Sequence, residues 1–347
     1  MTTIAVDAMG GDQGPEGLVS AALDVSQRHP GLSLILVGDK SIIEPILARS
    51  KNLSVDSDPA DTVADSDGGQ LQGKVSIRHA SQVITMDDKP AIALRTKKDA
   101  SMRVAIDLVA RGEADACVSA GNTGALMAIS RFVLRTCEGI DRPAILSALP
   151  SLNGQTFMLD LGANVDCNSE QLYQFALMGQ AVAAALTGTE SPRVALLNIG
   201  EEDVKGNDQV KLANELLRAD PGINYCGYIE GNDILSGKVD VIVCDGFVGN
   251  VALKSIEGTS KYFIVQLEAQ LAELGWKKYL FGWLLRPMLR LFLKQFHPAA
   301  HNGATLVGLR GIVVKSHGAA DQAAFSSAIE LAICEARHQL PRKIMSL

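Results

Sequence analysis

The sequence has few aromatic and few charged residues for a soluble protein. Aromatic side chains make up 5% of the 347 residues and charged ones 20%, whereas hydrophobic residues reach 47%. This composition excludes a disordered or collagen-like chain, because such chains lack the apolar residues that build a core. The formal net charge of −7 argues against nucleic acid as a partner, since nucleic-acid-binding proteins need a dominant basic surface. Any anionic partner must therefore meet a local basic patch.

Patterns typical of metal sites, disulfides and membrane spans are also missing. The six cysteines include no Cys-x-x-Cys pair and have no histidine at metal-ligand spacing, so we interpret them as small buried side chains in a reducing cytosol. No run approaches the roughly 18 apolar residues of a spanning helix. The first twelve residues lack the basic start and long apolar stretch of a signal peptide. The sequence therefore predicts a cytoplasmic protein.

Short β-branched runs alternate with segments of helical periodicity along most of the chain. Each run is apolar on successive residues, which indicates a strand buried on both faces of a parallel sheet. The predicted strands span 3–7, 32–38, 74–80, 115–120, 156–162, 193–200, 239–245 and 311–316. The predicted helices span 17–28, 101–111, 170–186, 208–218 and 321–337. This alternation predicts an α/β fold with a doubly wound, mostly parallel sheet in an α/β/α sandwich. We expect one catalytic unit over 1–347, built as one or two lobes.

One acidic segment breaks this alternation. Residues 54–74 carry five aspartates, two adjacent glycines and few apolar side chains. We expect a mobile surface insertion there, because the segment cannot bury enough apolar area to fold against the core.

A basic segment, 276–296, has the opposite character. It holds five basic residues, no acidic residue and both tryptophans of the chain. Its charges and Pro287 exclude a membrane span and predict a basic amphipathic helical hairpin at an anionic membrane surface. The alternatives are a subunit interface and ordinary core packing of the same apolar face. The side chains available for membrane contact include Trp276, Trp283, Leu284 and Phe292.

Polar, glycine-rich segments follow six of the predicted strands. They span 7–12, 119–125, 160–166, 198–208, 244–250 and 315–321. Ligands of open parallel sheets bind beyond the carboxyl ends of the strands, where helix N-termini favour anions. One such loop is usually a turn or a cap, but six at equivalent positions predict a cradle for phosphate or another oxyanion. The carboxylates Asp7, Asp12, Asp160 and Asp245 suit loop anchors at least as well as a metal site.

Two motifs of other enzyme classes are absent. No loop has G-x-G-x-x-G with an acidic residue about 20 positions later, and no G-x-S-x-G elbow occurs. The absence disfavours an NAD-dependent hydroxyacid dehydrogenase on a similar fold, which we keep as an alternative.

Eight segments resemble the bacterial phosphate acyltransferase family of phospholipid synthesis, in the order of that family. They are DAMGGD, MDDKPAIALRTKKDASM, SAGNTGALM, GIDRPA, DLGANVDC, NIGEEDVKGN, DGFVGN and NGATLVGLRGIVVKSHGAAD. The resemblance implies a fold similar to the phosphotransacetylase and isocitrate dehydrogenase group. It implies transfer of a fatty acyl group from acyl carrier protein to inorganic phosphate, without cofactor or metal, by a homodimer. Its acyl phosphate product would suit a position at the inner face of the membrane, beside a glycerol-phosphate acyltransferase.

The resemblance also implies roles for individual residues. Lys205 would contact the phosphate or the oxyanion, Asn250 would orient the substrate, and His317 would carry a proton. The structural alternatives are a solvated loop lysine, a helix N-cap and a capping histidine, respectively. The substrate-binding candidates are Asp7, Gly10, Gly11, Asn122, Thr123, Gly124, Asn164, Gly206 and Gly249.

A docking site for the carrier protein would have to be basic, because acyl carrier proteins are acidic. Four cations after the DDKP turn suit this role or an ordinary solvated helix face: Arg95, Lys97, Lys98 and Arg103. A non-catalytic carrier-protein or membrane scaffold is a further hypothesis. It would need the polar loops but not Lys205.

Overall fold

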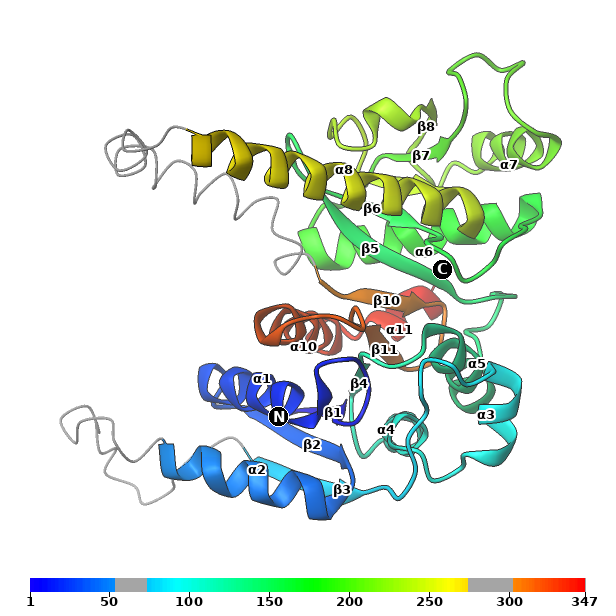
Figure 1. Ribbon diagram of the computed structural model, residues 1–347. Coiled ribbons are helices and arrows are strands. Elements are labelled where there is room, and N and C mark those ends of the chain that lie inside the picture. Colours follow the sequence, from blue (N-terminus) through cyan, green and yellow to red (C-terminus); the bar gives the residue numbers. More distant parts are fainter. Residues whose placement is uncertain (54–73, 274–301, 347) are drawn as a thin grey trace, which may run out of the picture. The chain divides into compact units, whose positions relative to one another are not determined.

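The computed structural model describes residues 1–53, 74–273 and 302–346 of the chain (Figure 1). All but the last residue of the acidic insertion 54–74, and the whole basic segment 276–296, lie outside the described residues. The chain divides into two compact units. The first unit comprises Met1–Pro143 and Asn302–Leu347, and the second comprises Ala144–His301.

The described residues of the first unit form six strands in the order β3-β2-β1-β4-β11-β10. Its strands are β1 (Thr2–Asp7), β2 (Leu32–Gly38), β3 (Lys74–His79), β4 (Ala116–Ser119), β10 (Ala304–Val307) and β11 (Ile312–Lys315). Its helices are α1 (Gly14–Arg28), α2 (Lys40–Leu53), α3 (Pro90–Thr96), α4 (Ser101–Ala110), α5 (Thr123–Leu134), α10 (Gln322–Arg337) and α11 (Leu340–Met345). The pairs from β3 to β11 are parallel, and β10 is antiparallel to β11.

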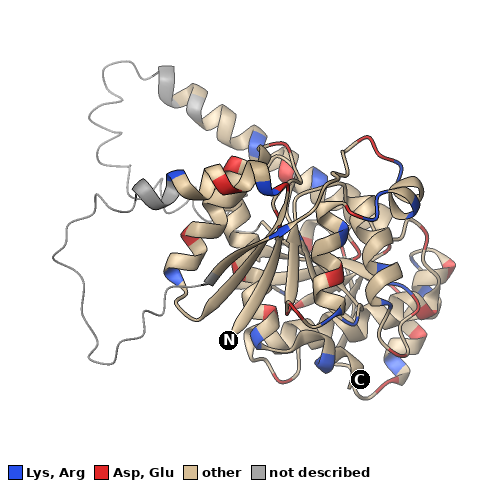
Figure 2. Cartoon of the chain, turned by 90° about the horizontal axis from the view of Figure 1, so that it is seen from below, with Lys and Arg blue, Asp and Glu red and all other residues tan. Residues whose placement is uncertain are grey.

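Helices cover both faces of this sheet. Ile4 and Val6 of β1 pack in one core cluster with α1, α2 and α10, whereas Ala5 packs in another with α4 and α5. Successive side chains of a strand point to opposite faces, so continuous apolar runs are needed where both faces are covered. Figure 2 shows the strands almost free of charged residues. The predicted doubly wound α/β class is confirmed.

Within its described part, 144–273, the second unit has five strands in the order β5-β6-β9-β7-β8. Its strands are β5 (Ala144–Ser151), β6 (Gly154–Leu159), β7 (Val194–Leu197), β8 (Tyr225–Ile229) and β9 (Val241–Val243). Its helices are α6 (Ser169–Thr187), α7 (Asp208–Ala219), the short 3-10 helix η2 (Gly231–Asp233) and α8 (Gly246–Glu273). The hairpin β5–β6 is antiparallel, and the other pairs are parallel.

Local signals explain where the helices of this unit begin and end. Asn168 and Gln171 form a capping box at the start of α6, and Gly188 ends that helix with a φ of 74°. Asn207 caps α7 by accepting a hydrogen bond from the Val210 N–H. Helix α8 is one long helix of 28 residues (Figure 1). Among the described residues, no helix is both long and apolar enough to cross a membrane.

Candidate functional site

A buried carboxylate joins the loops that follow β1 and β4 in the first unit. Asp7 Oδ2 accepts a hydrogen bond of 2.6 Å from Ser119 Oγ, which in turn accepts one of 3.1 Å from the Gly121 N–H. Burial raises the pKa of Asp7, and the hydroxyls of Ser119 and Ser101 oppose that rise. Asp7 thus holds these two loops together as a loop anchor; the sequence analysis also offered it as a metal-site carboxylate and as a substrate-binding candidate.

Lys315 connects a third strand end to this anchor, and the sequence analysis missed it. It is buried at the end of β11, and its Nζ donates to the Ala120 carbonyl at 3.2 Å and to the Ser316 carbonyl. A lysine at the end of an apolar strand resembles an ordinary exposed lysine in sequence. Its burial could have been suspected only from its place at the start of the polar segment 315–321.

The glycines of the first loop allow this packing. A Cβ at Gly10 would lie 2.7 Å from Asp7 Oδ2 and 2.8 Å from the Gly121 nitrogen. Gly11 adopts a φ of +85°, which is costly for other residues. Gly10 is thus needed for contact between loops, a use that the sequence analysis did not consider.

Asn122 fixes the start of α5 and a neighbouring loop. Its Oδ1 accepts from the Ala125 N–H at 3.0 Å, while its Nδ2 donates to the Met86 carbonyl at 2.8 Å and the Asp88 carbonyl at 3.2 Å. Thr123 and Gly124 follow it and are exposed. Their N–H groups belong to the first helical turn, so they remain available to an anion.

His317 is exposed after β11 and holds a turn rather than a helix. Its Nδ1 accepts from the Ala319 N–H at 3.1 Å, and its own N–H donates to Asn302 Oδ1 at 3.0 Å. Asp321 caps α10 by accepting from the Ala324 N–H. The helix-cap alternative for His317 is therefore wrong. In the neutral ring the proton belongs on Nε2, because Nδ1 is an acceptor.

The four predicted docking cations differ in their surroundings. Lys97 is half-buried and donates to Asp88 at 2.6 Å and the Val83 carbonyl at 2.8 Å, and this ion pair lowers the pKa of Asp88. Arg103 pairs with Asp107 and lies 5.6 Å from the centre of the Phe132 ring. Arg95 and Lys98 are exposed, with no ion-pair partner in the described part of the chain. Of the four predicted docking cations, Arg95 and Lys98 are therefore the two whose charges are available to a partner.

A second buried carboxylate organises the loop after β6 in the second unit. Asp160 is 0% exposed. It accepts hydrogen bonds from the Ile145, Gly162, Ala163 and Asn164 N–H groups and from Asn164 Nδ2, at 2.7 to 3.2 Å. Burial raises its pKa, and these donors oppose the rise. Asp160 and Asn164 thus hold this loop in one conformation.

The first turn of α8 packs directly on that loop. The Gly246 N–H donates to the Asn164 carbonyl at 2.7 Å. A Cβ at Gly249 would overlap the Asp160 carbonyl oxygen, so only glycine permits this approach. Asp245 accepts from the Val248 N–H at 2.8 Å and occupies the capping position. Asn250 lies within the helix and is exposed, so the N-cap interpretation of Asn250 is wrong.

Lys205 lies on the loop between β7 and α7. Asn198 Nδ2 donates to the Gly200 carbonyl at 3.1 Å and to the Lys205 carbonyl at 3.3 Å, which closes the loop, and Gly206 follows with a φ of +93°. Asp203 on the same loop pairs with Arg218 at 2.6 Å. Lys205 is exposed and has no ion-pair partner among the residues described, so its charge is available to a ligand.

The topology brings Asn164, Lys205 and Asn250 to one edge of the second unit. Strand β9 lies between β6 and β7 and is parallel to both. The carboxyl ends of the three strands therefore face the same way, and their loops leave side by side. The Lys205 ammonium and the Asn250 amide lie at this edge, on segments that hydrogen bonds hold in place. Together they form a site suited to an anionic group.

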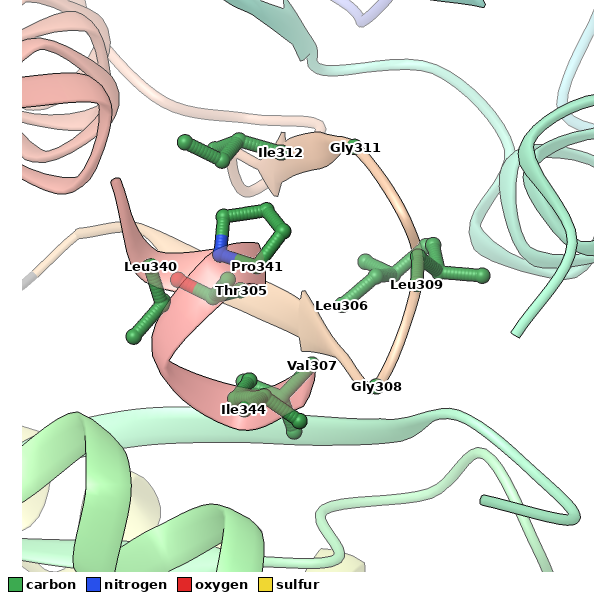
Figure 3. Close-up of a pocket in the computed structure, with 10 residues that line it drawn as sticks. All are labelled: Thr305, Leu306, Val307, Gly308, Leu309, Gly311, Ile312, Leu340, Pro341 and Ile344. Atoms are coloured by element: carbon green, nitrogen blue, oxygen red, sulfur yellow. The ribbon is translucent and has the colours of Figure 1, made fainter. Parts of the chain in front are cut away.

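Other features of the described residues do not point to a different site. No group of three His, Cys, Asp or Glu side chains within the described ranges is arranged to hold a metal ion. A small hollow in the first unit, between α11 and the β10–β11 hairpin (Figure 3), is lined by residues without ionisable side chains. These residues are Thr305, Leu306, Val307, Gly308, Leu309, Gly311, Ile312, Leu340, Pro341 and Ile344.

Comparisons with known proteins agree over nearly the whole chain. Residues 2–343 match the family described as fatty acid synthesis protein. A phosphate acyltransferase from Methylococcus capsulatus is 50% identical, covering 99% of this chain and 96% of the relative. One from Pseudomonas savastanoi pv. phaseolicola is 51% identical, covering 98% and 95%. A phosphotransacetylase structure from Streptococcus pyogenes has a TM-score of 0.61 at 16% identity, covering 97% of this chain and 94% of its own, and shares the fold.

Proposed function

Since the chain belongs to this fatty acid synthesis family, whose relatives are phosphate acyltransferases, we propose that it makes acyl phosphate from acyl carrier protein thioesters and inorganic phosphate. A phosphate oxygen forms a bond with the thioester carbonyl carbon. The carbon–sulfur bond then breaks, and the carrier leaves as a thiol whose proton comes from the hydrogenphosphate. This reaction needs a held anion and a polarised carbonyl, but no electron acceptor.

The observation that carries this proposal is that the Lys205 loop and the first turns of α8, which carry Asn250, follow the neighbouring parallel strands β7 and β9. The Lys205 ammonium lacks an ion-pair partner among the described residues and precedes the N-terminus of α7. Asn250 is exposed in the first turns of α8, where helix N–H groups favour negative charge. We assign Lys205 to the phosphate or the oxyanion and Asn250 to the carbonyl oxygen.

Alanine variants test these roles. Removing one positioned donor from an oxyanion typically lowers kcat about 10²- to 10³-fold, so we expect losses of that order in Lys205→Ala and Asn250→Ala. Lys261→Ala is the matched control, because Lys261 is exposed on α8 outside the loops. Hydroxylamine trapping of acyl phosphate measures the rate, and thermal unfolding reports the fold. Unchanged turnover in the two folded variants would exclude these roles.

In the first unit, we assign the exposed start of α5 and His317 to substrate. Thr123 and Gly124 offer first-turn N–H groups to an anion, and His317, whose Nδ1 accepts from the Ala319 N–H, keeps Nε2 for a proton or a hydrogen bond to substrate. His317→Asn preserves the acceptor that holds the turn, and it should lower kcat while leaving the melting temperature unchanged. A kcat equal to that of the wild type removes His317 from the proposal.

For the carrier protein we propose docking on Arg95 and Lys98, the two unengaged cations of the predicted set. Arg95→Glu with Lys98→Glu should raise KM for the acidic carrier thioester and leave kcat nearly constant, because charge complementarity acts mainly on association. Lys343→Glu is the control, because Lys343 is an exposed residue of α11. If the double variant and the Lys343→Glu control have equal KM values, the carrier protein docks elsewhere.

Homodimerisation and membrane association complete the proposal. The second half of α8 exposes Tyr262, Phe263 and Val265 at 62%, 66% and 51%, a surface suited to a second copy. Phe263→Asp should then yield a monomer in light scattering. The segment 276–296 would bind anionic membrane beside the glycerol-phosphate acyltransferase that consumes the product. Flotation with anionic vesicles tests this, and loss of binding in Leu284→Glu plus Phe292→Glu is the expected result.

A further inference from the structure

Large hydrophobic side chains are exposed on the same loops that hold Lys205 and Asn250. Val165 follows β6, Ile199 and Val204 follow β7, and α8 begins with a further three. Their exposed fractions are 62% for Val165, 78% for Ile199 and Val204, 63% for Phe247, 41% for Val248 and 50% for Val251. We name these six residues the apolar rim. Apolar side chains gathered at one edge of a sheet, amid polar loops, mark a binding surface.

The apolar rim adjoins the groups assigned to the reaction. Phe247, Asn250 and Val251 lie three and four positions apart on α8 and therefore share one face of the helix. Val204 directly precedes Lys205 on the β7 loop, and Val165 directly follows Asn164, whose carbonyl accepts from α8 at 2.7 Å. A molecule bound at Lys205 and Asn250 would thus have apolar side chains beside it.

We propose that the apolar rim binds the alkyl chain of the acyl substrate and sets its chain-length preference. This inference rests on the proposed function. In an acyl thioester the alkyl chain is bonded to the reacting carbonyl carbon, so a carbonyl held between Lys205 and Asn250 places its first methylenes within reach of the rim. The rim occurs on all three loops around these groups, which favours a substrate chain over a second copy of the protein.

The test compares kcat/KM for carrier thioesters of a short, a medium and a long saturated chain. Each methylene buried on the rim should raise kcat/KM by up to about fourfold. Ile199→Ser with Phe247→Ser should reduce this dependence on chain length, with losses that grow from short to long chains. Phe247→Leu preserves an apolar side chain, so it should leave the dependence of kcat/KM on chain length unchanged. Leu152→Ser is the matched control, because Leu152 is 86% exposed in the same unit, at the opposite end of β6.

The remaining outcomes separate the proposal from its premise. If the double serine variant keeps the wild-type dependence on chain length, the rim does not bind the chain. If it becomes monomeric in light scattering while its chain-length dependence is unchanged, the rim is a subunit interface. If wild-type protein forms no acyl phosphate from any thioester, the proposed function itself fails. For each of these variants, a melting temperature equal to that of the wild type would show that a loss of folding does not cause the change in kcat/KM.

Discussion

Replacing Asp160 with alanine tests whether the β6 loop depends on one buried carboxylate. Three of its five hydrogen bonds come from fully buried donors, the Ile145 N–H and the backbone and side-chain N–H groups of Asn164. Each donor left unsatisfied costs about 1–3 kcal/mol, and water entering the vacated space recovers part of this, so we expect a loss of about 3–5 kcal/mol. For a unit of this size, that corresponds to a fall in melting temperature of roughly 10 °C.

Calorimetry and the acyl phosphate assay together measure this prediction. The first turn of α8 packs on the Asp160 loop, so Asp160→Ala should also displace Asn250 and lower kcat more than it raises KM. Asp166→Ala is the control, because Asp166 lies on the same loop but is exposed. If Asp160→Ala has the same melting temperature as the wild-type protein, these hydrogen bonds do not stabilise the loop, and the loop does not position α8 as we describe.

Two further predictions concern a titrating group and a helix packing contact. Glu335 is fully buried, and burial raises its pKa to about 8. Between pH 4.5 and 8 the folded state keeps this proton while the unfolded chain loses it, so the free energy of unfolding falls as the pH rises. In urea titrations, Glu335→Gln should therefore gain about 3 kcal/mol relative to wild type between pH 4.5 and pH 7, and a constant difference would contradict the raised pKa. Gly249→Ala should lower kcat/KM more than about tenfold because its Cβ overlaps Asp160. Gly258→Ala, with open space around it on the same helix, should stabilise the protein by about 1 kcal/mol, and equal effects of the two changes would refute the packing argument.

Strong periodic signals made most of the fold predictable. All eight predicted strands are present, because runs such as LSLILVG can be buried only in the middle of a covered sheet. Strands β5, β8 and β10 were missed. Strand β5 contains Pro150 and two serines, β8 contains Gly227, and β10 is a short run interrupted by Thr305, so none carries a clear apolar pattern of its own. Pairing with a neighbouring strand supplies what their local sequence lacks.

The candidate site was predictable in its position more than in its contacts. The sequence placed polar loops at the carboxyl ends of the strands, and the described loops lie there. It did not indicate that Lys97 is tied to Asp88 or that Lys315 is buried, because pairing and burial depend on distant segments. The apolar rim also escaped notice, since an isolated Ile199 or Val204 in a loop has no periodicity that would reveal its exposure.

The stoichiometry of thiol release against acyl phosphate formation tests the central proposal most directly. With an acyl carrier protein thioester and excess inorganic phosphate, wild-type protein should release one free thiol for each hydroxylamine-trappable acyl phosphate. Release should stop when phosphate is omitted, and Lys205→Ala should lower both rates together. Thiol release without acyl phosphate, or equal release in the absence of phosphate, would mean that water and not phosphate accepts the acyl group.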